Sequence, residues 1–186
     1  KEDAARRVII FRPTVVFGER NVANMLRLMI QIDSGRYAHI GKAGNVKSIA
    51  YVKNLVAATL HAREVCGPGL HIFNYADEPH LSVRDIADTI AGALGRCRPF
   101  TLPYAAAVPV GLAFDAAIAL TGKDLPISSM RIKKALTATC HDATRIRTQG
   151  FKPQYTSKEG LQRMSAWYAR EKAAGRPPVP GENSSG

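Results

Sequence analysis

The sequence predicts an α/β fold in which a parallel sheet is joined to a mostly helical lobe. Apolar runs of strand length occur at residues 7–12 (RVIIFR) and 70–75 (LHIFNY), and segments of helical spacing lie between them. At 186 residues and 46% hydrophobic content, the chain is long enough for one folded unit with a core. After residue 80, helical patterns follow one another without a confident strand, which indicates a separate helical lobe.

The first half of the chain predicts strands that alternate with helices. Residues 7–12 end at Pro13, which is typical of a parallel strand buried on both faces. Residues 22–33 have helical spacing and are followed by Gly35 as a stop, and residues 37–40 form a short strand candidate. Residues 48–52 then lead into a helix that is expected to start near Asn54, which is interpreted as its cap.

The second half predicts a strand followed by several helices. The strand at 70–75 comes after a Gly-Pro-Gly break, and Ser82 has the form of an N-cap with Asp85 at the third helical position. Further helices are expected at 104–121, at 127–136 and at 157–172, the last capped by Ser157. Residues 173–186 are rich in Pro, Gly and Ser and are expected to be disordered.

Composition excludes several classes of protein. The three cysteines are far apart and lack metal-ligand spacing, which favours reduced thiols in a cytoplasmic protein and no metal site. The longest apolar stretch, 102–120, contains two prolines and an aspartate, so no membrane span is expected. The net charge of +11 suits an anionic partner, although a charge imbalance between two halves of a longer protein explains it equally well. With only 7% aromatic residues, a nucleic-acid partner is not expected.

No motif in the chain makes a self-contained active site. A glycine fingerprint for dinucleotides, a phosphate-binding Gly-x-x-x-x-Gly-Lys loop and a nucleophile elbow are all missing. The chain begins at Lys1 and runs almost at once into a strand pattern, which we interpret as a cut inside a larger protein.

Residues 7–21 (RVIIFRPTVVFGERN) resemble the sixth strand and following loop of the extended short-chain dehydrogenase/reductase family. The family pattern is an apolar strand, Arg-Pro, two residues, Val, an aromatic residue and Gly, here Arg12, Pro13, Val16, Phe17 and Gly18. The carboxyl end of a parallel strand is where open α/β sheets bind ligands. The resemblance implies that Pro13 and Val16 line the nicotinamide pocket of NAD in the whole enzyme. The alternative is an ordinary strand end.

The resemblance also implies a substrate-binding set. Residues 41–62 are similar to the family's glycine turn, strand and helix, and Lys47 stands where the family has an arginine that binds the substrate's diphosphate. A lysine keeps the charge and loses the bidentate fork. Taken alone, without the resemblance, Lys47 would be interpreted as a solvated surface lysine.

Two further segments align with substrate-contacting parts of the family. Arg20, Asn21, Asn24 and Met25 match the segment that contacts the base, ribose and sugar, and Arg131 lies where a second phosphate-directed arginine is found. Asn24 is the preferred ligand because an amide inside an apolar helical pattern needs a reason. Asn21 serves equally well as a helix-start cap.

The closing segments complete the resemblance. Residues 70–90 and 130–168 are similar to the family's last strand and to its Gly-Phe-x-Pro, Glu-Gly-Leu and Trp-Tyr pattern, and His141 within them is interpreted as structural or surface. Tyr168 and Lys172 have the Tyr-x-x-x-Lys spacing of the family's catalytic pair. In the family that pair precedes the Arg-Pro strand, so no catalytic residue is expected here.

The resemblance implies the carboxyl-terminal part of a Rossmann-like sheet in residues 1–80, a mostly helical substrate-binding lobe in 81–172 and a tail in 173–186. The implied function is binding of a UDP- or dTDP-sugar within an NAD-dependent epimerase or dehydratase of surface-polysaccharide synthesis, with an epimerase favoured. The chain alone is expected to be inactive and not to retain NAD, and the whole protein to be a homodimer. The alternative is a non-catalytic nucleotide-binding or assembly module on the same fold.

Overall fold

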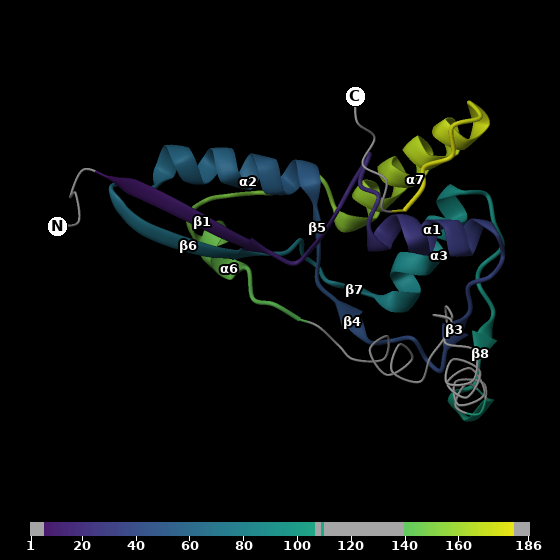
Figure 1. The fold of residues 1–186 in the computed structure, drawn as a ribbon. Coiled ribbons are helices and arrows are strands. Elements are labelled where there is room, and N and C mark those ends of the chain that lie inside the picture. The colour runs from purple at the N-terminus through teal and green to yellow at the C-terminus, as the bar shows by residue number, and fades with distance from the viewer. Residues whose placement is uncertain (1–5, 107–108, 110–139, 181–186) are drawn as a thin grey trace, which may run out of the picture.

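A computed structural model describes residues 6–106, 109 and 140–180 (Figure 1). Its elements are β1 (Arg7–Pro13), β2 (Val15–Phe17), α1 (Asn24–Asp33), β3 (His39–Ile40), β4 (Val46–Lys47), β5 (Ile49–Tyr51), α2 (Val52–Val65), β6 (Gly69–Tyr75), β7 (Leu81–Ser82), α3 (Val83–Ala93), β8 (Thr101–Leu102), α6 (Thr144–Thr148) and α7 (Ser157–Ala173). Strands β1 and β6 lie along α2, whereas α1, α3 and α7 gather at the other end of the molecule (Figure 1). The mixture of helices with parallel strand pairs confirms the predicted α/β class.

Strands β1 and β6 form a parallel pair that runs from Arg7 opposite Gly69 to Pro13 opposite Tyr75. One face of the pair packs against α2, because Ile9 and Phe11 contact a buried cluster that includes Ala58. Both strands occupy the segments that the apolar runs predict.

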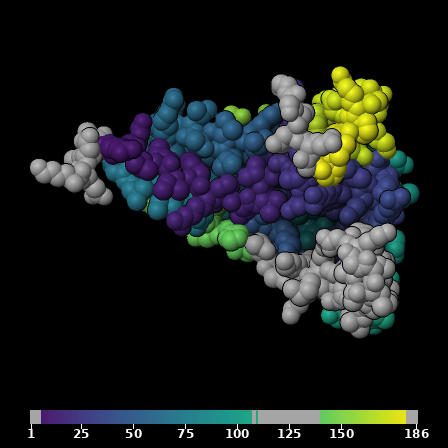
Figure 2. Space-filling model, viewed as in Figure 1, coloured from purple at the N-terminus to yellow at the C-terminus, as the bar shows by residue number. Residues whose placement is uncertain are grey.

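The prediction that the first strand is buried on both faces is wrong for the described structure. Val8 and Ile10 are 37% and 40% exposed, and Leu70 on β6 is 61% exposed. Successive side chains of a strand point to opposite faces, and helix α2 covers only the face that carries Ile9 and Phe11. The space-filling view shows β1, in purple, open to the viewer along its length (Figure 2).

A second parallel pair, β2 with β5, connects the sheet to the helical end. Phe17 and Tyr51, from these two strands, are fully buried in a cluster with residues of α1, α3 and α7. Strand β4 pairs antiparallel with β7, and β3 pairs parallel with β8. The helical end is therefore tied to the sheet through short strands that occur between the helices.

Helix α2 begins at Val52, so the expectation that Asn54 caps it is wrong. The backbone N–H of Tyr51, at the N-cap, donates to Asp77 Oδ2 over 2.6 Å. Asn54 is fully buried; its amide donates to Asp77 Oδ1 and to the Tyr155 carbonyl, and its Oδ1 accepts from the Tyr155 N–H. Burial raises the pKa of Asp77, and the hydrogen bonds that its carboxylate accepts lower the pKa by less than burial raises it. Among the described residues no side chain caps α2, and Asn54 instead joins α2 to Asp77 and to Tyr155.

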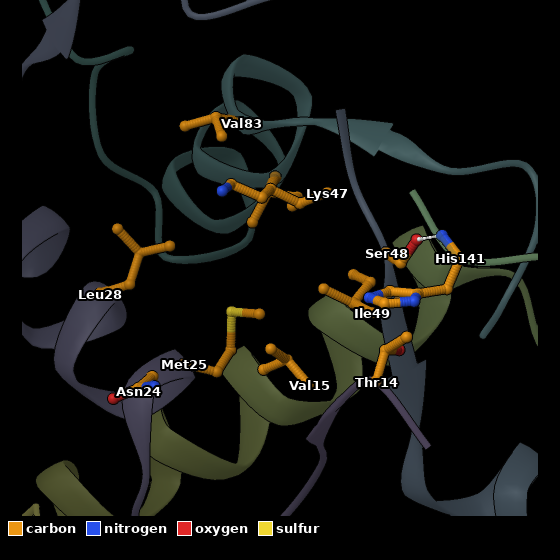
Figure 3. A pocket seen from close by; sticks show the side chains of 11 residues that line it. Thr14, Val15, Asn24, Met25, Leu28, Lys47, Ser48, Ile49, Val83 and His141 are labelled. Carbon is orange, nitrogen blue, oxygen red and sulfur yellow. Dashed lines mark hydrogen bonds between the residues drawn. The ribbon is translucent and has the colours of Figure 1, made fainter. Parts of the chain in front are cut away.

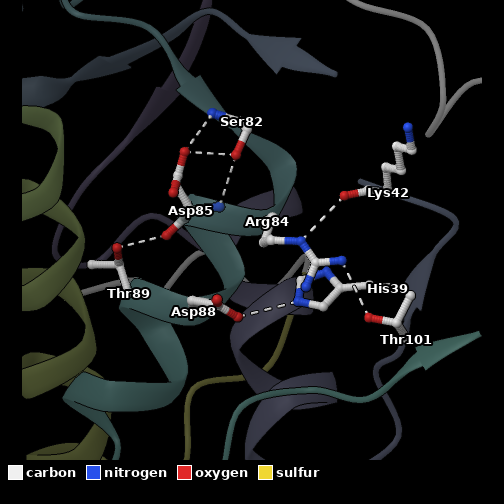
Figure 4. A network of polar contacts seen from close by, with 8 residues as sticks. All are labelled: His39, Lys42, Ser82, Arg84, Asp85, Asp88, Thr89 and Thr101. Atoms are coloured by element: carbon white, nitrogen blue, oxygen red, sulfur yellow. Dashed lines mark hydrogen bonds and ion pairs between the residues drawn. The ribbon is translucent and has the colours of Figure 1, made fainter. Parts of the chain in front are cut away.

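The caps of the two long later helices are local. Ser82 and Asp85 form a reciprocal capping box at the start of α3, as predicted (Figure 4). For α7 the predicted cap is displaced by one residue, because Thr156 forms the box with Glu159 while Ser157 is the first helical residue and is buried.

The remaining predicted elements are described only in part. The helices expected at 104–121 and 127–136 lie almost entirely outside the described residues, as do residues 181–186. Helix α6 lies in a stretch where no helix was predicted, and α7 ends at Ala173, close to the predicted end. Within the described ranges, no helix combines the length and the apolar character that crossing a membrane needs.

Candidate functional site

A cavity of about 500 Å³ opens where the chain leaves β1 and where α1, α3 and the β4–β5 segment meet (Figure 3). The described residues that line it come from segments far apart in the sequence: Thr14, Val15, Asn24, Met25, Leu28, Lys47, Ser48, Ile49, Val83, Ile86 and His141. The volume lies in the range of small-molecule sites.

Most of the cavity wall is apolar. Met25 and Leu28 are three residues apart on α1, and Val83 and Ile86 are three residues apart on α3. Residues at this spacing share one helical face, so each helix presents two apolar side chains to the cavity. The wall is thus built by the same periodicity that builds the core.

Lys47 is the permanently charged residue among the described cavity residues, and it is half-buried. It lies on β4, opposite Leu81 of β7. The turn before it is held to α3, because the Val83 N–H donates to the Asn45 carbonyl and the Arg84 N–H donates to the Ala43 carbonyl, each over 3.0 Å. Short strand and turn contacts therefore fix the backbone that carries the cation.

Asn24 and Met25 lie in the same cavity as Lys47, as the resemblance implies for substrate ligands. The reason given for choosing Asn24 is wrong, however, because Asn24 is the first residue of α1 and is exposed rather than enclosed by the helix. Asn21 holds the preceding loop: its Oδ1 accepts from the Ala23 N–H over 2.9 Å, and its amide donates to the Val16 carbonyl.

Arg20, one of the predicted cationic ligands, does not line the described cavity. Arg20 is exposed, has a positive φ of 67° and is not among the lining residues. Arg131 lies outside the described residues. Among the described basic residues that were predicted as ligands, Lys47 therefore lines the cavity and Arg20 does not.

The residues expected to face the cofactor flank the cavity. Pro13 ends β1 and is exposed, and Val16 on β2 packs against the cluster between α2 and β6. Thr14 and Val15, which lie between Pro13 and Val16 in the sequence, line the cavity. An exposed proline ring at a strand end fits one wall of a nicotinamide pocket, but the sequence contains no glycine loop for the phosphates of NAD. The described residues therefore provide at most one side of a cofactor site.

His141, Thr14 and Ser48 are cavity residues that the sequence did not single out. His141 was interpreted as structural or surface, yet it lines the cavity, and its backbone N–H donates to Ser48 Oγ over 2.9 Å. That contact joins residues 93 positions apart, so no local pattern could indicate it. In the described part of the chain the Thr14 hydroxyl is buried without a hydrogen-bond partner.

Tyr168 and Lys172, which match the Tyr-x-x-x-Lys spacing, connect helix α7 to helix α1. The Tyr168 hydroxyl and the Lys172 ammonium both donate to Asp33 Oδ2 at the end of α1. Burial and the Asp33 carboxylate raise the pKa of Tyr168 to about 12. A catalytic tyrosinate needs a lowered pKa, whereas the pKa of Tyr168 is raised, so this pair is not suited to catalysis.

A cavity at the carboxyl end of a parallel strand, flanked by helices, places the chain among the Rossmann-like α/β proteins that bind ligands at this edge. No family model matches the chain. A curated relative, the N-acetyl-α-D-glucosaminyl-diphospho-ditrans,octacis-undecaprenol 4-epimerase of Escherichia coli O157:H7, is 36% identical over 164 residues, which are 88% of this chain and 50% of the relative.

Solved structures agree on the fold. The human epimerase family protein SDR39U1 with NADPH aligns with a TM-score of 0.61 at 19% identity, over 86% of this chain and 48% of that one. The UDP-N-acetylglucosamine 4-epimerase from Bacillus cereus aligns with a TM-score of 0.59 at 13% identity, over 89% and 48%. The resemblance that the motifs carry, to the extended short-chain dehydrogenase/reductase epimerases and dehydratases, is confirmed by this curated relative and by these folds. It spans about half the length of the curated relative that it matches.

Proposed function

We propose that the cavity binds the diphosphate and sugar of a sugar-diphosphate substrate, and that the chain is the substrate-binding region of an NAD-dependent sugar epimerase. The observation that carries this proposal is the placement of Lys47 in one cavity with Asn24 and Met25, beside the end of β1. In this proposal residues 81–172 form the substrate lobe, because α3 supplies one wall.

The electrostatics of the cavity suit a diphosphate. A sugar diphosphate brings about two negative charges, and a charge-assisted hydrogen bond from an ammonium is stronger than a neutral one. The apolar side chains around Lys47 lower the local dielectric, which strengthens its attraction for an anion. A lysine acts here as a point charge and does not impose the bidentate geometry of arginine.

The chemistry itself belongs elsewhere in the whole protein. Bound NAD supplies the hydride acceptor in such enzymes. Pro13 and Val16 would form one wall beside it, whereas a tyrosine and lysine of suitable position are not found in this chain. We therefore propose that the chain positions the substrate and does not catalyse by itself.

The carrier attached to the diphosphate has two candidates. The family resemblance favours a nucleotide, UDP or dTDP. The lining favours a polyprenol, because the described cavity residues include Met25, Leu28, Val83 and Ile86 but no Phe, Tyr or Trp ring on which a base could stack. The curated relative is by its name an epimerase of a sugar on diphospho-undecaprenol.

Calorimetric titration with UDP, UDP-N-acetylglucosamine, farnesyl diphosphate and NAD tests the proposal. Lys47→Ala should weaken every diphosphate ligand by about 10- to 100-fold, the loss expected for one charge-assisted hydrogen bond. Lys152→Ala is the matched control, because Lys152 is exposed and does not line the cavity. Absence of binding by the unaltered chain, or equal losses in the two variants, would refute the diphosphate site. Tighter binding of farnesyl diphosphate than of UDP would identify the polyprenol as carrier.

The reaction is tested in the full-length protein. Incubation with the carrier-linked sugar and NAD, followed by NMR analysis of the sugar, should show inversion at one carbon. A product that has lost water would indicate a dehydratase. No turnover of any sugar diphosphate that binds would favour the non-catalytic module.

A further inference from the structure

We infer that His141 and Thr14 form the sugar-recognising end of the cavity, while Lys47 holds the diphosphate. This inference rests on the proposed function and assigns sugar specificity to a histidine that the family motifs do not include. It gives the cavity a direction, with the reacting sugar next to the end of β1.

Thr14 supplies a hydroxyl that lacks a partner in the described part of the chain. The residue directly follows β1, and its backbone N–H donates to the Tyr75 carbonyl over 3.0 Å, which fixes the backbone. Its Oγ1 is buried and has no hydrogen-bond partner among the described residues, although Thr14 lines the cavity. A buried polar group without a partner is rare in folded proteins, and at the wall of a cavity a ligand is a natural partner.

His141 is held in place by its backbone. Its N–H donates to the Oγ of Ser48, which is only 3% exposed and directly follows Lys47. The imidazole makes no hydrogen bond within the part of the chain that the structure describes, and the residue is exposed to the cavity. The segment that carries the cation thus also positions a free imidazole.

The two ends of the cavity differ in chemistry. In Figure 3 the His141 ring and Thr14 lie on the same side, around Ile49, whereas the Lys47 ammonium points toward the side of Leu28. A diphosphate offers only acceptors, which suits an ammonium. A sugar ring offers hydroxyls that both donate and accept, and threonine and neutral histidine can likewise do both. The Thr14–His141 end therefore suits the sugar.

Paired titrations separate the two ends, with UDP-N-acetylglucosamine compared with UDP in each variant. His141→Ala and Thr14→Val should each weaken binding of the sugar nucleotide by about tenfold, the loss of one neutral hydrogen bond, and leave UDP binding within about twofold. Lys47→Ala should weaken both ligands. His71→Ala is the control, because His71 lies on β6, contacts the Gly67 carbonyl and does not line the cavity. If the carrier is a polyprenol, N-acetylglucosaminyl farnesyl diphosphate and farnesyl diphosphate form the corresponding pair.

The outcomes distinguish the inference from the proposal beneath it. Equal losses for UDP and the sugar nucleotide in His141→Ala would make His141 a phosphate ligand and overturn the inference. No loss in His141→Ala and Thr14→Val, with losses for both ligands in Lys47→Ala, would overturn the inference and leave the diphosphate site standing. A selective loss of the sugar ligand in His141→Ala, with no effect of Lys47→Ala, would keep the sugar end and refute the diphosphate site. Thermal unfolding checks folding; Thr14→Val should not lower the melting temperature, because it removes a hydroxyl that lacks a partner.

Discussion

Gly160 lets α7 pack closely against Tyr51 of β5 and Phe17 of β2, and replacing it with alanine tests that packing. A Cβ at position 160 would lie 2.8 Å from Cγ of Tyr51 and 3.1 Å from Cζ of Phe17. Neither ring can move easily, because both are fully buried and the Tyr51 hydroxyl donates to Glu19 Oε2 over 3.0 Å. The added methyl group must therefore displace the helix or the rings.

The expected magnitude follows from two opposing effects. Alanine is favoured over glycine inside a helix by about 1 kcal/mol. Overpacking a buried contact of this kind costs about 3 kcal/mol at the upper end of the usual range. Gly160→Ala should thus lower the free energy of unfolding by about 2 kcal/mol, which corresponds to a fall in melting temperature of roughly 4–8 °C for a chain of this size.

Gly92→Ala is the matched control, because it makes the same substitution in α3. A Cβ at Gly92 would meet no atom within 4 Å, and the residue is exposed. This variant should gain about 0.5–1 kcal/mol of stability from helix propensity alone. Urea unfolding followed by circular dichroism measures both variants. If Gly160→Ala is as stable as Gly92→Ala, α7 does not pack on Tyr51 and the described core is wrong.

Three further changes probe the contacts that hold the cavity. Asn54→Ala should cost about 3 kcal/mol in urea unfolding, because it leaves buried partners of the amide without hydrogen bonds. Burial acts to raise the pKa of Asp33, but hydrogen bonds from Lys172, Tyr168 and Arg96 outweigh it and lower that pKa below its ordinary value of 3.8. Its contribution to stability is therefore complete above the unfolded pKa and is lost as pH falls through the folded pKa, so Asp33→Asn should flatten the decline of melting temperature below pH 4. Ser82→Ala removes the α3 cap and should cost about 1 kcal/mol, measured by thermal unfolding.

Local signals in the sequence predicted the features that depend on neighbouring residues. The capping box at Ser82 and the strands β1 and β6 needed only spacing and residue type. Asn54 was misinterpreted as a helix cap because its partners, Asp77 and Tyr155, lie 23 and 101 residues further along the chain. Hydrogen bonds to partners at such distances leave no signature in the residues around α2.

The candidate site divides in the same way. Lys47, Asn24 and Met25 could be named because they lie within motif-bearing segments, and they do share one cavity. His141 reaches that cavity through Ser48, far away in the sequence, and Thr14 is distinguished only by a hydroxyl that has no partner among the residues the structure describes. Neither property can be read from residue type or spacing.

Two networks outside the cavity hold its walls in position before a ligand arrives. At the sheet end, Asp77 binds both the Tyr51 N–H and the Asn54 amide, which fixes β5 and the segment that carries Lys47. At the helical end, Asp33 joins α1 to Arg96, which follows α3, and to Lys172 of α7.

Because α1 and α3 each supply part of the apolar wall, a brace between their ends limits how far the wall can open. A preformed site spends less of its binding energy on ordering side chains. Tyr168 and Lys172, which have the spacing of a catalytic Tyr-x-x-x-Lys pair, therefore support ligand binding indirectly, because both donate hydrogen bonds to Asp33. The same contact with Asp33, together with burial, raises the pKa of Tyr168.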